Sequence, residues 1–244
     1  MTKNDSEAAS DPGPGEPAGS WREAAVSRSL GSARARAENR VQRFLDAAIE
    51  LMNEGDSDKD FTVQEVVERS GQSLRTFYQY FGGKQELLLA VFEESVRSTT
   101  EVLTEKISKE EDAFGRLHRF VVEYYRLCRP APQGKSSKKA VTTSVMVDFA
   151  QQLLTGQPRD AAMAFAPLVS LFGELLDDAA ADGAIRAGLR RSPIAGMVLE
   201  AIMFNAFSTT IASTTMQGQA AEAVDPAEQL WDLVVNGIGA QPKG

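Results

Sequence analysis

A glycine between two short helical patterns, in the segment from Phe61 to Leu88, constrains the fold of this chain more than any other feature. The segment reads FTVQEVVERSGQSLRTFYQYFGGKQELL. The first pattern ends at Gly71, and the second ends at a Gly-Gly pair. Helices of about two turns are not stable alone in water, so they must pack against each other and against a further helix. The spacing therefore predicts a helix-turn-helix over residues 62–81.

Local signals mark where these helices begin and end. Thr62 and Glu65 have the spacing of a capping box, in which the hydroxyl and the carboxylate each accept a backbone N–H. Gly71 is suited to the left-handed conformation that ends a helix. Ser73 is placed to cap the second helix, expected over residues 74–80. We expect Phe44, Ile49, Val66, Val67, Phe77 and Phe81 to form the core of this unit.

Apolar residues recur at helical spacing through most of the remaining chain, and we find no convincing alternation typical of strands. The sequence therefore predicts an all-α protein of about nine helices, three short ones in an N-terminal head and six longer ones in a body. The expected ranges are 41–52, 62–70, 74–80, 84–106, 111–128, 139–154, 159–181, 193–216 and 226–238. Residues 1–33 are rich in Gly, Pro, Ser, Ala and acidic side chains, and we expect a disordered tail there.

The distribution of charge is uneven. The whole chain has a net charge of -8, but residues 20–84 carry ten basic and ten acidic side chains. The helix-turn-helix region is therefore the least acidic part of an acidic protein. A cluster of basic residues lies at its start: Arg28, Arg34, Arg36, Arg40 and Arg43. Such a cluster suits contact with nucleic acid, and equally suits a solvated helix face.

Several classes of protein are disfavoured by composition. Cys128 is the single cysteine, which excludes an intrachain disulfide and fits a reducing compartment. No run of 18 to 20 apolar residues and no apolar signal segment is present, so we expect a cytoplasmic protein with no membrane span. With His118 as the single histidine, we expect no catalytic set, no metal site and no cofactor. His118 is interpreted as a partly buried helix residue and Cys128 as a small apolar filler.

The residues from Gly71 to Leu88 resemble the signature of the TetR family of bacterial transcriptional regulators. In that family a glycine precedes a short recognition helix with the pattern seen here in Thr76, Phe77, Tyr78, Tyr80 and Phe81, and a lysine and a leucine pair follow, as at Lys84, Leu87 and Leu88. The resemblance covers residues 37 to about 97, and the helix layout over 37–240 is also similar. Gln72, Ser70 and Gln85 depart from the family pattern, which affects the packing of the turn.

The resemblance implies a DNA-binding head over residues 37–97, a ligand-binding and dimerisation body over 98–240, and double-stranded DNA as the partner. The third helix of such a head lies in the major groove. Donors for phosphate oxygens would be Thr62, Thr76, Tyr78, Tyr80 and Lys84, and the candidates to read bases would be Gln64, Leu74, Arg75 and Gln79. Ser73, which caps the recognition helix, belongs to the same DNA-binding set. Arg34 and Arg36 would follow a phosphate or enter the minor groove.

Each of these roles has a structural alternative. The alternatives to phosphate contact are that the two tyrosines are packing residues, that Lys84 is a solvated side chain, and that Thr62 acts primarily as a helix cap. In the body, large apolar side chains at helical spacing are mostly core, but in the resembled family these helices enclose a cavity for a small apolar effector. Thr142, Asp148 and Asn205 are polar residues that suit a role as ligand contacts and a role as ordinary buried or interfacial residues equally well.

The last two long helices are expected to form the interface of a homodimer, since the first is apolar nearly all round and must be covered. A two-fold dimer presents two heads to a palindromic operator. The sequence thus favours a transcriptional regulator, in particular a repressor released from its operator by an effector. The alternatives are an activator on the same fold, or a protein that sequesters small molecules and has a degenerate DNA-binding head.

Overall fold

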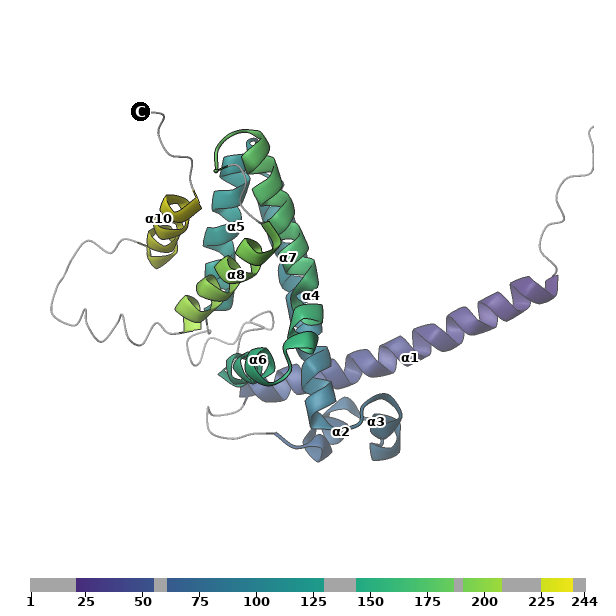
Figure 1. Ribbon diagram of the computed structural model, residues 1–244. Helices are drawn as coiled ribbons and strands as arrows, with labels where there is room; N and C mark the ends of the chain where they lie inside the picture. The colour runs from purple at the N-terminus through teal and green to yellow at the C-terminus, as the bar shows by residue number, and fades with distance from the viewer. Residues whose placement is uncertain (1–20, 55–60, 130–143, 187–190, 208–224, 239–244) are drawn as a thin grey trace, which may run out of the picture. The chain divides into compact units, whose positions relative to one another are not determined.

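The computed structural model describes residues 21–54, 61–129, 144–186, 191–207 and 225–238 (Figure 1). Nine α-helices lie in this part of the chain, one for each predicted helix, and the all-α fold class is confirmed. Their bounds are α1 Trp21–Glu54, α2 Val63–Ser70, α3 Leu74–Tyr80, α4 Lys84–Ile107, α5 Ala113–Cys128, α6 Ser144–Gly156, α7 Pro158–Ala181, α8 Arg191–Phe207 and α10 Pro226–Ile238. None of the helices in the described ranges is long and apolar enough to cross a membrane.

The start of α1 differs from the sequence prediction. Residues 21–33 were expected to belong to a disordered tail, but α1 begins at Trp21. The reason is that the Gly- and Pro-rich composition ends at about residue 19, and the Ala, Arg and Glu residues that follow favour helix. The rest of the expected tail, the first residues of the predicted helix 139–154 and the end of the predicted helix 193–216 lie outside the described residues. Two compact units divide the chain, 1–42 and 43–244.

An aromatic cluster forms the core of the head within the second unit. The ring of Phe44 on α1 packs edge-on against Phe77 and Phe81, with centroid distances of 5.4 and 6.0 Å. Phe77 and Phe81 lie 5.4 Å apart. These three residues, together with Val66 and Val67 of α2, are buried as predicted, whereas Ile49 is only partly buried.

Three long helices form the centre of the body. Figure 1 shows α4, α5 and α7 side by side, and each packs against the other two. Helix α6 packs on α4 and α7, α8 packs on α5 and α7, and α10 packs on α5. Buried aromatic and aliphatic side chains fill the centre, among them a stacked pair formed by Phe120 and Phe172, 4.8 Å apart. Helix α4 begins beside the head and ends in the body, so it is shared by both.

A buried carboxylate joins three helices of the body. Glu123 on α5 is 7% exposed and accepts from Lys106 Nζ at 2.7 Å and from Arg126 Nη1 at 3.0 Å. Arg126 Nη2 in turn reaches Asp225 Oδ2 at 2.6 Å, next to the start of α10. Burial is the largest effect on Glu123 and raises its pKa, but Lys106 and Arg126 together outweigh it, so the net pKa lies below the ordinary value. The cluster links the end of α4 and the start of α10 to α5.

Because the pKa of Glu123 is lowered by folding, its contribution to stability is present above the pKa of an unfolded glutamate and is lost as the pH falls through the folded pKa. We expect Glu123→Gln to lower the free energy of unfolding by about 1–3 kcal/mol at neutral pH, because two cations lose their partner. The difference from the wild type should shrink below about pH 4.5. Urea denaturation at a series of pH values, followed by far-ultraviolet circular dichroism, measures it.

The control is Glu101→Gln, which removes a carboxylate from an exposed pair with Arg97. That variant should change stability by less than about 0.5 kcal/mol. Equal effects of the two substitutions across the pH series would contradict a special role for the buried carboxylate.

Candidate nucleic-acid interface and ligand cavity

The turn between α2 and α3 depends on the backbone conformation of Gly71. Its φ of 64° and ψ of 28° place it in the left-handed region, as the sequence predicts. The N–H groups of Gly71 and Gln72 donate to the carbonyls of Glu68 and Val67, each at 3.2 Å, and so satisfy the end of α2. The chain can then reverse and begin α3 three residues later.

Side-chain caps fix the starts of both helices. The backbone N–H of Glu65 donates to Thr62 Oγ1 at 3.3 Å, and the Thr62 N–H donates to Glu65 Oε2 at 2.7 Å, which confirms the capping box. The N–H of Thr76 donates to Ser73 Oγ at 3.0 Å, and the Ser73 and Thr76 hydroxyls are 2.8 Å apart. The first turn of α3 is thus held in place by its own cap.

One side of α3 carries large side chains that point away from the core. Phe77 is buried, whereas Leu74 is 43% exposed and Tyr78 is 58% exposed. Arg75 and Gln79 are exposed as well. We call Leu74, Arg75, Tyr78 and Gln79 the reading face. The Tyr78 ring also packs edge-on against Phe77, with a centroid distance of 5.3 Å.

Lys84 has a structural role that the sequence did not reveal. Its Nζ donates to the carbonyl of Phe61 at 2.6 Å and lies 4.3 Å from the centre of the Phe61 ring. The first residue of α4 is therefore tied to the residue before the cap of α2. The alternative that Lys84 is simply solvated is wrong, and its predicted contact with phosphate would be made from this position beside the head.

Glu86 is a further residue that the sequence reasoning missed. Its Oε2 accepts the N–H of Gly82 at 2.5 Å, which folds the first turn of α4 back on the loop after α3. A Cβ on Gly82 would approach this oxygen to 2.9 Å. The signal in the sequence was an acidic residue in the first turn of a helix, four positions after the first glycine.

The remaining predicted residues are only partly available. Gln64 Nε2 donates to Glu68 Oε1 at 2.9 Å, and Thr62 Oγ1 donates to Glu65 Oε2 at 2.9 Å. Tyr80 and Thr76 are half-buried. In the first unit, Arg36 is exposed and Arg34 forms an ion pair with Glu38 at 2.7 Å.

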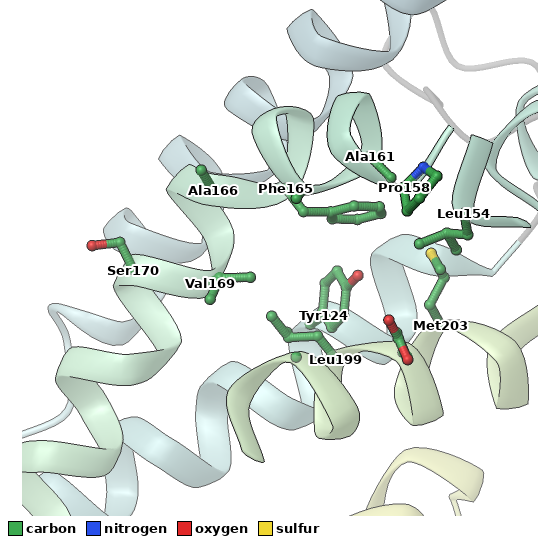
Figure 2. A pocket seen from close by; sticks show the side chains of 13 residues that line it. Tyr124, Leu154, Pro158, Ala161, Phe165, Ala166, Val169, Ser170, Leu199 and Met203 are labelled. Atoms are coloured by element: carbon green, nitrogen blue, oxygen red, sulfur yellow. The ribbon is translucent and has the colours of Figure 1, made fainter. Parts of the chain in front are cut away.

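A second feature, in the body, is a cavity of about 500 Å³ among α5, α6, α7 and α8 (Figure 2). Its lining is mainly apolar, with the hydroxyls of Tyr124 and Ser170 and the carboxylate of Glu200 as side-chain polar groups. The full lining is Tyr124, Leu154, Pro158, Ala161, Ala162, Phe165, Ala166, Val169, Ser170, Gly196, Leu199, Glu200 and Met203. The volume and polarity are those of a small-molecule site.

The polar residues considered as ligand contacts from the sequence lie elsewhere. Asp148 and Asn205 are exposed and do not line this cavity, and Thr142 lies outside the described residues. Helical spacing placed Tyr124 and Phe165 among the apolar residues of the body, but spacing does not tell core from cavity wall. Cys128 is buried beside Tyr124, and burial raises the pKa of its thiol to about 12, so the thiol stays protonated at neutral pH.

Helices α8 and α10 leave large apolar side chains uncovered. Met197 and Phe204 on α8 are exposed, as is Leu233 on α10. Leu199, Ile202 and Met203, on the side of α8 that faces the body, are buried. His118, predicted to be partly buried, bonds through Nε2 to Glu228 of α10 at 2.7 Å, and its ring packs against Trp231. Three large apolar side chains of these two helices are therefore solvent-exposed in the single chain.

Comparison with known families gives a match for the head. Residues 44–91, which include the turn, α3 and the start of α4, match the family model described as bacterial regulatory proteins, tetR family. A comparison with curated protein sequences found no match.

Solved structures share the fold. A TetR-family transcriptional regulator from Pectobacterium atrosepticum is 17% identical over 86% of this chain and 99% of its own, with a TM-score of 0.61. The transcriptional regulator FadR from Bacillus subtilis, solved in complex with stearoyl-CoA, is 18% identical over 81% of this chain and 98% of its own, with a TM-score of 0.58. A TetR family transcription regulator from Marinobacter aquaeolei is 17% identical over 85% of this chain and 100% of its own, with a TM-score of 0.54. These likenesses show the fold.

Two glycines offer a test of how the head is built. Nothing lies within 4 Å of a Cβ added at Gly71 or at Gly83, but Gly71 has φ 64° and Gly83 has an extended φ of 166°. We expect Gly71→Ala to lower the free energy of unfolding by about 1–2 kcal/mol through backbone strain alone. Gly83→Ala should stay within about 0.5 kcal/mol. Thermal and urea denaturation measure both, and equal losses would contradict the strained turn.

Proposed function

We propose that the chain is a member of the TetR family of bacterial transcriptional regulators, whose family model matches residues 44–91, and that it acts as a repressor. As a homodimer it binds a palindromic operator, and a small apolar effector that enters the cavity releases it. The observation that carries the proposal is the reading face of α3, held rigidly by a capped turn and an aromatic core.

Support for DNA contact comes from the chemistry of that face. Arg75 is suited to bind guanine through two hydrogen bonds, Gln79 to bind adenine, and Leu74 to contact a thymine methyl group. None of these three side chains has a hydrogen bond or ion pair with another described residue. Phe77 anchors the opposite side of α3 in the core, so the reading face is held at a fixed orientation. DNA binding would therefore disturb little of the packing in the core of the head.

The starts of the short helices would supply the phosphate contacts. The hydroxyls of Thr62, Thr76, Tyr78 and Tyr80 and the ammonium group of Lys84 are the proposed donors, with the helix N-terminal amides beside them. Thr62 and Thr76 are helix-cap partners as well, so their role in DNA binding is secondary to their role in folding. Tyr78 is 58% exposed and, unlike Thr62 and Thr76, is not a helix-cap partner, so it is the principal phosphate contact in this proposal.

A dimer follows from the uncovered apolar face of α8 and α10. Leaving Met197, Phe204 and Leu233 in water is unfavourable, and a second copy of the same face would cover them. A two-fold interface of this kind places two reading faces on one duplex, which doubles the contacts and matches a palindrome.

A route from the cavity to the head exists within the second unit. Phe165 of α7 lines the cavity and packs edge-on against Phe92 of α4 at a centroid distance of 5.3 Å. Phe92 also contacts Phe149 of α6 at 6.0 Å. We propose that an effector in the cavity displaces Phe165 and so moves α4, whose first residue holds Phe61 of the head. A coupling of about 1–3 kcal/mol is sufficient to change operator occupancy several-fold to a hundredfold.

Selection of bound duplexes from a random pool by the purified protein tests DNA recognition. We expect enrichment of a palindrome. Arg75→Ala should relax the base preference at one position of each half-site and cost about 1–3 kcal/mol. Tyr78→Phe, which removes the hydroxyl alone, should weaken binding to all duplexes alike, because phosphate contacts carry no base preference.

The salt concentration must be stated in these experiments, since phosphate contacts make the affinity steeply salt-dependent. Gln85→Ala, at an exposed position outside the proposed contacts, is the matched control and should leave selection unchanged. If the wild type enriches no sequence at moderate salt, the DNA-binding proposal is wrong and a sequestering role for the body gains support.

Two exposed methionines offer a matched test of the dimer. Met197 on α8 is 68% exposed and Met163 on α7 is 63% exposed. Because neither contributes much to the core, Met197→Asp and Met163→Asp should both fold. We expect Met197→Asp alone to weaken self-association by at least about tenfold, since a carboxylate would be buried in the apolar interface. Sedimentation equilibrium measures this, and a dimer unaffected by Met197→Asp would rule out the α8 interface.

A further inference from the structure

Among the described residues that line the cavity, Glu200 alone carries a formal charge, and that charge is negative. Resting on the proposed effector role of this cavity, we propose that its ligand is an amphiphilic cation, an apolar body that bears a protonated amine or similar group, with Glu200 as the counter-charge. The inference names the chemical class of the effector, which neither the fold nor the family match determines.

Glu200 stands on α8 at the wall of the cavity, next to Leu199 in the chain and about one helical turn from Gly196 and from Met203. Its carboxylate has no hydrogen bond or ion pair with any other described residue. By contrast, the carboxylates of Glu123, Asp225 and Glu228 in the neighbouring helices are each paired with a cation or with histidine. Glu200 is therefore the one charged group at this cavity that is left available to a ligand among the described residues.

No lysine, arginine or histidine belongs to the described lining. An anionic head group, such as a carboxylate, would enter the cavity without a counter-charge and would be repelled by Glu200. A cation would be attracted to Glu200, with a strength that solvent reduces because this side chain is exposed. The formal charge of the lining thus distinguishes between two classes of amphiphile that the apolar surface alone would accept equally.

Aromatic rings give a second, independent reason. Figure 2 shows the rings of Tyr124 and Phe165 on facing sides of the cavity, with Leu199 and Met203 beside them. The faces of aromatic rings attract cations and offer nothing comparable to anions. A ligand with its positive group near Glu200 and its apolar chain among Phe165, Val169 and Leu154 would use both features of the wall.

Three probes of equal chain length and different charge test the proposal: decylamine, decanol and decanoate. Isothermal titration calorimetry with the full-length protein in the absence of DNA measures their affinities below their aggregation concentrations. We expect one decylamine per chain, bound about tenfold more tightly than decanoate, with decanol between them. A competition titration, in which decanol displaces decylamine, would show that the two probes share one site.

Variants at Glu200 assign the preference to this side chain. Glu200 is exposed, so Glu200→Gln and Glu200→Lys should keep the fold, which circular dichroism verifies. Glu200→Gln should reduce the preference for decylamine over decanoate to about twofold, and Glu200→Lys should reverse it. Glu93→Gln and Glu93→Lys, at an exposed glutamate of α4 outside the cavity, change the net charge by the same amounts and should keep the tenfold preference.

The outcomes separate this inference from the function on which it rests. If the wild type binds decanoate as tightly as decylamine while binding all three probes at one site, the cationic class is wrong and the effector cavity stands. If the preference survives Glu200→Gln, Glu200 is not the counter-charge, and the inference fails. If none of the probes binds, both the cationic class and the apolar effector of the proposed function are overturned.

Discussion

The burial of Phe77 against Phe44 and Phe81 is the interaction on which the rest of the head depends. Helix α3 has seven residues, too few to be stable in water without tertiary contacts. Its exposed side carries Leu74, Arg75, Tyr78 and Gln79, of which Tyr78 also packs edge-on against the Phe77 ring at 5.3 Å. The buried ring of Phe77 and the cap at Ser73 hold the helix in place. A recognition surface made of exposed side chains is possible because one aromatic residue anchors it.

Helix α4 connects this head to the body. Lys84 at its start holds the carbonyl of Phe61, and Phe92 further along packs against Phe149 and Phe165. One helix thus contacts the head at one end and, through Phe92, the cavity-wall residue Phe165 further along. Close-packed contacts of this kind transmit a displacement rather than absorb it, since the interior has little free volume. The proposed control of DNA binding by a ligand needs such a shared element.

Much of the head was predictable from residue types at fixed spacings. The capping box, the cap at Ser73, the left-handed Gly71 and the bounds of α3 are all set by local backbone chemistry, and the structure confirms them. The contact of Lys84 with Phe61 was not predictable, because the two residues are 23 positions apart and no local pattern links them. The residues of the cavity wall were not predictable for a related reason. Phe165 and Phe172 lie on the same helix seven positions apart, yet Phe165 lines the cavity and Phe172 stacks on Phe120 in the core.

The sequence by itself determined the all-α class, the helix-turn-helix, its caps and its resemblance to the TetR family, because helix starts, turns and amphipathic periodicity depend on neighbours within a few residues. Only the tertiary structure decided which carboxylate is buried among cations and where the body is hollow. It also placed Glu200, and not Asp148 or Asn205, at the cavity wall. Those properties depend on which faces of distant helices meet, and that is fixed by packing in three dimensions.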